Sequence, residues 1–523
     1  MSGRQAGAAV AIGSALLLAL VASAGWVGDD AFITLRVIDN AWHGYGLRWN
    51  VIERVQVYTH PLWMLLLGAL YGVSREPFWT TIAASLAATG ALLHIVTTRI
   101  ARTVAGAVLA LALFAGSKAF VEFSTSGLEN PLSHLLLALL ALSASSPSPA
   151  PWRLSGLAAL VALCRFDLLA VIAPLWLSGA SSCLASEPAT GRLRVGLALV
   201  AGWWPLAAWL AFAVVYYGAV VPNTALAKLP SNVPRIDLAA QGLWYFRDSF
   251  VSDPVTLLVI ATATVHALRT PGARSTGVAL ALGLAVVIAV GGDFMSGRFL
   301  TPAFVLAVCH VARHVALPAA AAGTAIAALA LGVAMPESPL RVWRLAPREQ
   351  RVVTHGHGIL DERAFYASFT SVWAVLGAHG PEQHPWARGA RDAQLAPRIM
   401  VFEAVGLLGY HAGPGGHILD PLALTDPVAS RLPALPGWRI GHFRREFPEG
   451  YEAAIHACLA AVFPANAIAP PAGPCPPVPP STFTLPSMAA LHEHVVLLSQ
   501  APITDSRRPA AIWREITRVA GAR

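Results

Sequence analysis

The sequence predicts an α-helical polytopic membrane protein with about eleven transmembrane helices and a C-terminal domain of mixed α and β structure. Hydrophobic residues make up 56% of the 523 residues and charged residues only 12%, a composition that excludes a water-soluble globule and a disordered chain. The stretch 8–26 is almost wholly apolar and long enough to cross a bilayer. Further apolar runs follow as far as residue 335, where prolines, glycines, histidines and charges become frequent.

Basic residues separate the apolar runs and set their direction. By the positive-inside rule we assign the N-terminus and five clusters to the cytoplasm, namely Arg99 with Arg102, Arg153, Arg192 with Arg194, Arg269 with Arg274, and Arg313 with His314. The predicted spans are 8–27, 79–98, 103–118, 131–147, 154–163, 168–182, 195–217, 254–268, 276–291, 298–312 and 316–335. Because their number is odd, the C-terminal part lies outside. The net charge of +8 reflects these loops, so we predict no nucleic-acid partner.

Two domains follow from this threading. Residues 1–335 form a transmembrane module with a large first outer loop, 29–78, in which the apolar stretch 61–73 is a juxtamembrane helix. Residues 336–523 form a soluble extracytoplasmic domain. Cys458 and Cys475 both lie in this domain, where they either pair or remain free thiols.

The threading places every polar motif on the outer face of the membrane. These motifs are Asp29-Asp30, the run 126–130 with Glu129, Arg165-Phe166-Asp167, Pro222-Asn223-Thr224, and Gly292-Asp293 with Arg298. Intramembrane and boundary charges are costly, so they indicate a functional site. The two aspartates are either proton acceptors or a helix-end cap. Glu129 has a capping alternative before Pro131, and Asp293 with Arg298 has the alternative of a structural ion pair.

Several motifs together resemble a known family. The run DDAFITLRVIDNAWHGYGLRWN (29–50) and then ERVQVYTHPLW (53–63) resemble the first loop of the GT-C membrane glycosyltransferases that use polyprenyl-phosphate sugars. The likeness is greatest to the branch containing the mycobacterial terminal (β-1,2) arabinofuranosyltransferase and its uncharacterised relatives. Other agreeing pieces are TSGLENPL (125–132), RFD (165–167), VPNTALAK (221–228), GGDFMSGRFLTP (291–302), DERAFY (361–366) and the runs 406–433 and 439–451.

The resemblance implies roles for the polar residues. One of the two aspartates would be the catalytic base that deprotonates the acceptor hydroxyl, and we prefer Asp30 to Asp29. Arg36, His60, Lys228 and Arg298 are candidates for the donor phosphate, since cations hold a leaving phosphate. The remaining candidates for substrate binding are Glu129, Arg165, Asp167, Asn223 and Asp293. No protein metal site is predicted, because His355, His357, His411, His417 and His442 lack metal-ligand spacing. A divalent cation at the aspartates is left open, although no full ligand set accompanies them.

The implied function is transfer of a sugar, with arabinofuranose as the best guess, from a polyprenyl-phosphate donor to a cell-surface glycan acceptor. The partners are therefore the lipid-linked donor, the glycan acceptor and membrane lipid. The expected location is the bacterial cytoplasmic (inner) membrane, with the active site and the C-terminal domain facing the periplasm, in cell-wall biogenesis. A pilin or protein glycosyltransferase of the same fold and a lipid-linked sugar transporter or flippase remain as alternatives. A transporter predicts midplane polar groups and two related halves, and the sequence has neither.

Overall fold

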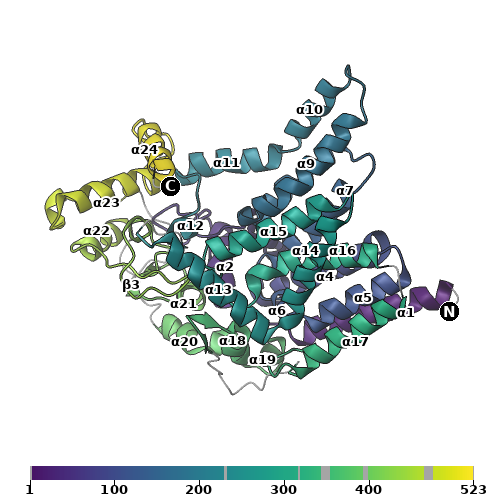
Figure 1. The fold of residues 1–523 in the computed structure, drawn as a ribbon. Helices are drawn as coiled ribbons and strands as arrows, with labels where there is room; N and C mark the ends of the chain where they lie inside the picture. The colour runs from purple at the N-terminus through teal and green to yellow at the C-terminus, as the bar shows by residue number, and fades with distance from the viewer. Residues whose placement is uncertain are drawn as a thin grey trace. The chain divides into compact units, whose positions relative to one another are not determined.

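The computed structural model describes residues 3–228, 232–315, 318–342, 354–392, 398–463 and 475–521. These residues are mostly helical, as predicted, and the strands among them are short (Figure 1). Contacts divide the chain into two compact units that are each built from three segments. Unit 1 comprises residues 1–28, 78–207 and 235–378, and unit 2 comprises residues 29–77, 208–234 and 379–523.

This division does not follow the boundary drawn from composition at residue 335. The segment 336–378 groups with the apolar helices of unit 1, whereas the loop 29–77 groups with residues 379–523 in unit 2. Both helices and strands occur in the described part of 336–523. A separate extracytoplasmic domain over 336–523 stays a prediction.

Unit 1 is built from long apolar helices. In chain order its elements are α1 (Gly3–Ser23), α4 (Pro77–Ile95), η1 (Val96–Ile100), α5 (Val104–Gly116), α6 (Lys118–Phe123), α7 (Asn130–Ala144), α8 (Pro151–Cys164), η2 (Phe166–Leu168), α9 (Leu169–Ala185), α10 (Arg192–Ala201), α13 (Arg235–Ser252), α14 (Pro254–Arg269), α15 (Arg274–Ala289), η3 (Arg298–Leu300), α16 (Thr301–His314), α17 (Pro318–Ala334), β1 (Thr354–Gly356), β2 (Ile359–Leu360), α18 (Glu362–Thr370) and α19 (Val372–Leu376).

Small residues let these helices approach closely. Helix α5 packs against α1, α16 and α17 (Figure 1). A Cβ added at Gly116 of α5 would lie 2.8 Å from the carbonyl oxygen of Ala328 in α17. A side chain at that position would therefore force the two backbones apart, which is the reason small residues favour close helix pairs in membrane proteins.

Unit 2 carries shorter elements and more loops. In chain order its elements are α2 (Asp29–Trp42), α3 (Pro61–Ser74), most of α11 (Trp204–Tyr217), α12 (Asn223–Lys228), η4 (Pro381–Gln383), α20 (Pro385–Asp392), β3 (Arg398–Val401), α21 (Val405–Ala412), β4 (Gly416–Leu419), η5 (Ala429–Arg431), α22 (Tyr451–Val462), η6 (Pro480–Thr482), α23 (Pro486–Ser499) and α24 (Arg508–Gly521).

A small β–α–β unit organises the centre of unit 2. Strands β3 and β4 pair in parallel, with Val401 opposite Leu419, and α21 connects them. Helix α2 packs against α21. A separate apolar cluster gathers around Tyr451 and Cys458, and Cys458 forms a disulfide with Cys475. The sequence left this pairing open against two free thiols.

Three helical segments are long and apolar enough to cross a membrane, judged by length and composition over the described residues. They are Gln5–Ser23, Pro77–Ile100 and Phe166–Ala185, and the number rises to five if two bent pairs, Arg192–Ala201 with Trp204–Tyr217 and Arg235–Ser252 with Pro254–Arg269, each count as one span. The apolar stretch 61–73 is helical as expected, in α3. The count of eleven spans and their direction stay predictions.

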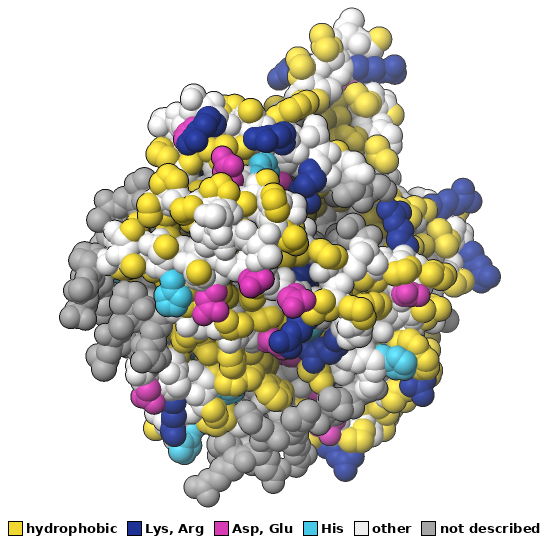
Figure 2. Space-filling view, turned by 90° about the vertical axis from the view of Figure 1, so that its left-hand side faces the viewer, with side chains coloured by type: hydrophobic (Ala, Val, Ile, Leu, Met, Phe, Trp, Pro, Cys, Tyr) yellow, Lys and Arg dark blue, Asp and Glu magenta, His cyan; other side chains and the backbone are white. Residues whose placement is uncertain are grey.

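Exposed apolar side chains fit a chain that contacts lipid. Figure 2 shows hydrophobic side chains spread widely over one face, between single charged side chains. On the bent pair α10–α11, Leu193, Val200 and Trp204 are each at least 70% exposed. A soluble monomer rarely exposes large apolar side chains so densely.

Candidate functional site

Five of the predicted residues meet in unit 1 in one cluster of opposite charges. Glu129 precedes α7, Arg165 and Asp167 flank Phe166 between α8 and α9, and Asp293 and Arg298 come from the turn between α15 and α16. Their ion pairs join three loops that are distant in sequence. We call these five residues the arginine–carboxylate cluster. The placement of all outer-face motifs in one layer stays a prediction.

Arg298 is held between two buried carboxylates. Its Nη2 lies 3.1 Å from Oε1 of Glu129 and its Nη1 lies 3.3 Å from Oδ2 of Asp293. The side chains of Glu129 and Asp293 are 2% and 3% exposed. The predicted ion pair between Asp293 and Arg298 is therefore present. Glu129 stands at the N-cap position of α7, but its side chain makes no capping hydrogen bond to that helix. A contribution of its charge to the helix dipole stays a prediction.

The turn that carries Asp293 and Arg298 is held by backbone and aromatic contacts. Gly292 has a φ of +74°, and a Cβ there would lie 2.4 Å from the ring of Tyr245, so this position requires glycine. The hydroxyl of Tyr245 donates to the Met295 carbonyl and accepts from the Phe299 amide, both at 3.0 Å. Leu360 in β2 adds two backbone hydrogen bonds, to Phe294 and from Ser296. The turn is thus fixed before any substrate arrives.

Arg165 has a different environment, because its main partner is exposed. Its Nε and Nη2 donate to the two carboxylate oxygens of Asp167 at 3.1 and 2.5 Å. The Arg165 side chain is 4% exposed, whereas that of Asp167 is 43% exposed. Nε also lies 3.7 Å from Glu129, and the guanidinium lies 5.0 Å from the centre of the Phe299 ring. This arrangement offers a planar cation next to a carboxylate that is open to solvent.

In unit 2, Asp29 holds one helix to another. Its carboxylate accepts hydrogen bonds from the backbone amides of Gly406 and Leu407 at 3.0 and 2.7 Å, at the start of α21. Carboxylates are favoured at helix N-termini, where amides lack intrahelical partners. Burial raises the pKa of Asp29 from 3.8 to about 7, although the two amide contacts oppose this rise. Asp29 therefore acts as a clamp on α21.

Asp30 is left open by the same packing. It is half-buried, and its carboxylate makes no hydrogen bond or ion pair with any other residue that the structure describes. Its neighbour on the chain is committed to α21, so Asp30 is the carboxylate of the pair that is available to a proton donor. This difference supports the preference for Asp30 over Asp29 as the candidate base.

Arg36 is buried at the other end of α21. Its Nη1 donates to the Gly409 carbonyl at 2.8 Å, and its Nη2 donates to the carbonyls of Gly416 and Gly413 at 2.5 and 3.3 Å. Its guanidinium lies 4.4 Å from the centre of the Trp49 ring, a cation–π contact. Burial lowers the pKa of Arg36 to about 9. A phosphate could use Nη1 and Nη2 of Arg36 only if these carbonyl contacts broke, whereas Nε has no hydrogen-bond partner among the described residues.

The other predicted residues of unit 2 also serve packing contacts. His60 Nε2 lies 2.9 Å from the hydroxyl of Thr34. The amide nitrogen of Asn223 donates to the carbonyls of Ala423, Leu424 and Asp426 at 3.0 to 3.2 Å. Lys228 is half-buried at the end of α12. A phosphate-binding role for His60 and Lys228 and a substrate-binding role for Asn223 stay predictions.

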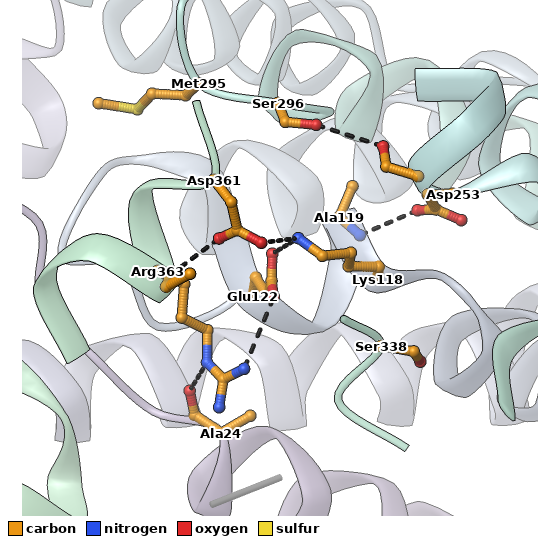
Figure 3. A network of polar contacts seen from close by, with 12 residues as sticks. Ala24, Lys118, Ala119, Glu122, Asp253, Met295, Ser296, Ser338, Asp361 and Arg363 are labelled. Atoms are coloured by element: carbon orange, nitrogen blue, oxygen red, sulfur yellow. Dashed lines mark hydrogen bonds and ion pairs between the residues drawn. The ribbon is translucent and has the colours of Figure 1, made fainter. Parts of the chain in front are cut away.

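A second charged network in unit 1 was not predicted. Lys118 Nζ lies 2.6 Å from Glu122 and 2.9 Å from Asp361, and Arg363 lies 3.6 Å from Glu122 (Figure 3). We call these four residues the Lys118 cluster. Asp361 also caps α18 by accepting from the amide of Ala364 at 2.9 Å. The available signal was the spacing of Lys118 and Glu122, four residues apart in an apolar run, which suits a helical ion pair.

A metal site is not apparent in the part of the chain that the structure describes. Among those residues, no group of three or more His, Cys, Asp or Glu side chains is placed to hold a metal ion. The side chain of His355 lies outside the described residues. The acids of the run 406–433 follow turn chemistry: Asp420 accepts from the amides of Leu422 and Thr425, and Asp426 accepts from those of Val428 and Ala429.

Two known proteins are similar to most of the chain. A terminal β-(1→2)-arabinofuranosyltransferase of Mycobacterium tuberculosis is 27% identical, over 81% of this chain and 81% of that protein. A protein of the same name from Corynebacterium glutamicum is 26% identical, over 80% of this chain and 72% of that protein. No family model matches the chain. No solved structure matches it either. The chain is a distant relative of the terminal β-(1→2)-arabinofuranosyltransferase branch.

Proposed function

We propose that the protein is a membrane glycosyltransferase that moves a sugar, with arabinofuranose as the first candidate, from a polyprenyl-phosphate donor to a cell-surface glycan. The observation that carries this proposal is the similarity over four-fifths of the chain to two proteins named for arabinofuranosyl transfer. The reaction would take place at the outer face of a bacterial inner membrane, where the donor phosphate and a surface glycan meet.

The proposed chemistry assigns one step to each of two groups of residues. Asp30 takes the proton of the acceptor hydroxyl as its oxygen forms a bond to the anomeric carbon of the donor sugar. The bond between that carbon and the phosphate oxygen breaks, and the polyprenyl phosphate leaves with its electron pair. Arg165 and Arg298 stabilise the negative charge that develops on the leaving phosphate. Each role is argued within its own unit. In unit 2 the half-buried carboxylate of Asp30 has no partner among the described residues, and in unit 1 Arg165 and Arg298 are buried cations.

The test is transfer by the purified protein in lipid nanodiscs. A panel of polyprenyl-phosphate sugars is supplied with an arabinan-like acceptor, and loss of lipid-linked sugar is measured. Asp30→Asn is expected to lower the rate by roughly 10²–10⁴-fold, the usual contribution of a general base. Asp39→Asn is the matched control, because Asp39 lies on the same helix and contacts Tyr71 instead. Wild-type rates in Asp30→Asn would disprove the base assignment, and the absence of turnover with every donor would disprove the function.

A further inference from the structure

The two arginines of the arginine–carboxylate cluster are both buried, with 4% of the Arg165 side chain and 8% of the Arg298 side chain exposed, but their carboxylate partners differ in exposure. Arg298 is enclosed by two carboxylates that are both at least 97% buried. Arg165 is held mainly by Asp167, the one member of the cluster whose side chain is substantially exposed, at 43%. Asp167 lies only two residues along the chain, on the short helix η2. Asp167 is therefore the carboxylate that a ligand could displace with the least disturbance of the buried residues.

Arg165 also has a donor without an acceptor. Its Nη1 is buried and has no hydrogen-bond partner among the residues that the structure describes, whereas Nε and Nη2 both contact Asp167. Buried polar groups in proteins are nearly always hydrogen-bonded, so an orphan donor calls for a partner such as a water, an ion or a ligand. Because Nη1 is closed to solvent, a partner reaches it only when a neighbouring side chain moves. The exposed neighbour on this arginine is Asp167.

The position of Arg165 along the chain suits a lipid headgroup. The next residue, Phe166, begins the segment Phe166–Ala185, which is one of the three long enough and apolar enough to cross a membrane. Arg165 therefore stands at the end of a candidate span, where the phosphate of a membrane-embedded lipid would lie. Phe166 is 51% exposed and offers an apolar surface next to the cation.

The charges of the cluster limit which anion can bind. Glu129, Asp167 and Asp293 against Arg165 and Arg298 give a formal charge of −1. An anion that adds to these contacts would make the net charge of the cluster more negative. An anion that replaces Asp167 at the guanidinium would leave Arg165 paired with one negative charge, as it is now. A phosphodiester has one negative charge and two free oxygens, so it matches a carboxylate on the planar fork of an arginine. A diphosphate would bring excess negative charge.

We propose that Asp167 is an internal competitor for the donor phosphate. In the free protein it occupies Nε and Nη2 of Arg165, and a singly charged polyprenyl phosphodiester displaces it and places its two free oxygens on the edge formed by Nη2 and Nη1. No covalent bond changes in this step. The inference rests on the proposed function, because it concerns the phosphate site of that reaction, and it adds both the competing residue and the class of lipid phosphate that is preferred.

Equilibrium binding of a non-transferable lipid tests the competitor role without turnover. The probe is a polyprenyl methyl phosphate, which has one negative charge, added to the full chain in nanodiscs of zwitterionic lipid. Asp167→Asn keeps the size of the side chain but removes its charge, so it is expected to bind the probe about threefold to tenfold more tightly than wild type. Arg165→Met is expected to lose binding. Asp237→Asn is the matched control, because Asp237 is an exposed acid on α13 with no contact to the cluster.

The outcomes separate this inference from the proposed function. Tighter binding by Asp167→Asn, including binding that appears only in this variant, supports the competitor role. Unchanged or weaker binding by Asp167→Asn, when wild type binds the probe, overturns that role and leaves the proposed donor class standing. If neither protein binds the probe, both are overturned. Polyprenyl diphosphate serves as a second ligand, and wild-type protein that prefers it would contradict the charge argument.

Discussion

The Lys118 cluster allows a prediction whose size follows from the geometry. Lys118→Met removes one cation and keeps an unbranched apolar stem. Its ammonium lies 2.6 Å from Glu122 and 2.9 Å from Asp361, whose side chains are 4% and 3% exposed. Removing one partner of a buried ion pair leaves an uncompensated charge and costs about 3–5 kcal/mol. We expect a loss of unfolding free energy in this range at neutral pH.

The same geometry predicts that the loss depends on pH. After the substitution, the carboxylate of Glu122 keeps the more distant Arg363, at 3.6 Å, as its one cation among the described residues, whereas Asp361 keeps the amide of Ala364. Burial already raises the pKa of Glu122 from 4.5 to about 7, and loss of the lysine raises this pKa further. An acid whose pKa is raised by folding destabilises the protein as pH rises from the unfolded pKa to the folded pKa. The loss in Lys118→Met should therefore be smaller at pH 5 than at pH 8.

Thermal unfolding in nanodiscs measures both effects. Cys164, Cys183 and Cys309 are buried free thiols, so their reaction with a maleimide dye reports unfolding. Lys118→Met is expected to lower the Tm by about 5–10 °C at pH 8. Arg444→Met is the control, because Arg444 and its partner Glu403 are 62% and 47% exposed and such pairs contribute about 0–1 kcal/mol.

A double variant separates charge from packing. Lys118→Met with Glu122→Leu replaces the pair by apolar groups, so it should recover much of the stability that the single variant loses. The reasoning would be refuted by a single variant within about 1 kcal/mol of wild type. It would also be refuted by a loss that is independent of pH, or by a double variant that is less stable than the single one.

Two further predictions concern unit 2. A Cβ at Gly406 would lie 1.8 Å from the Asp29 carbonyl oxygen, so Gly406→Ala should lower the free energy of unfolding by about 3 kcal/mol or more, measured by thermal unfolding. A Cβ at Gly415 would meet no atom within 4 Å, so Gly415→Ala should lower it much less. Equal costs would contradict the close packing of α2 on α21. Burial raises the pKa of Glu53 from 4.5 to about 8, so the stability of wild type should fall as pH rises from about 5 to 8. Glu53→Gln should reduce the loss of unfolding free energy between pH 5 and pH 8 by up to about 4 kcal/mol. The same loss in the variant as in wild type would show that Glu53 ionises without cost.

The apolar pattern and the cost of buried charge made the unit 1 cluster predictable. Arg165 and Asp167 interrupt an apolar stretch, and Glu129 and Arg298 each precede one. Because a charge in such a place needs a partner, residues from separate loops had to find one another. The same argument applied to Lys118, but its partner Asp361 lies more than 200 residues away, and no local pattern pointed to that pairing.

The roles of Arg36 and Asn223 were harder to infer, because their partners are backbone carbonyls. Arg36 contacts Gly409 and Gly416, and Asn223 contacts Ala423 and Leu424, all from distant parts of the sequence. Carbonyl groups exist at every residue, so the sequence carries no sign of which of them will be buried near a cation or amide. Residue type therefore indicated polar contacts at these positions but could not distinguish a structural contact from a substrate contact.

The geometry of α2 separates the two adjacent aspartates. Consecutive helical residues point about 100° apart, so Asp29 and Asp30 cannot both face α21, whereas Asp29 and Arg36, seven residues apart, share one face. That face places an acid at the amides that begin α21 and a cation at the carbonyls near its end. Substitution of Asp29 would therefore release α21 before it affected any chemistry. Asp30 lies off this face, so its substitution tests proton transfer in a protein whose α2–α21 contact is intact.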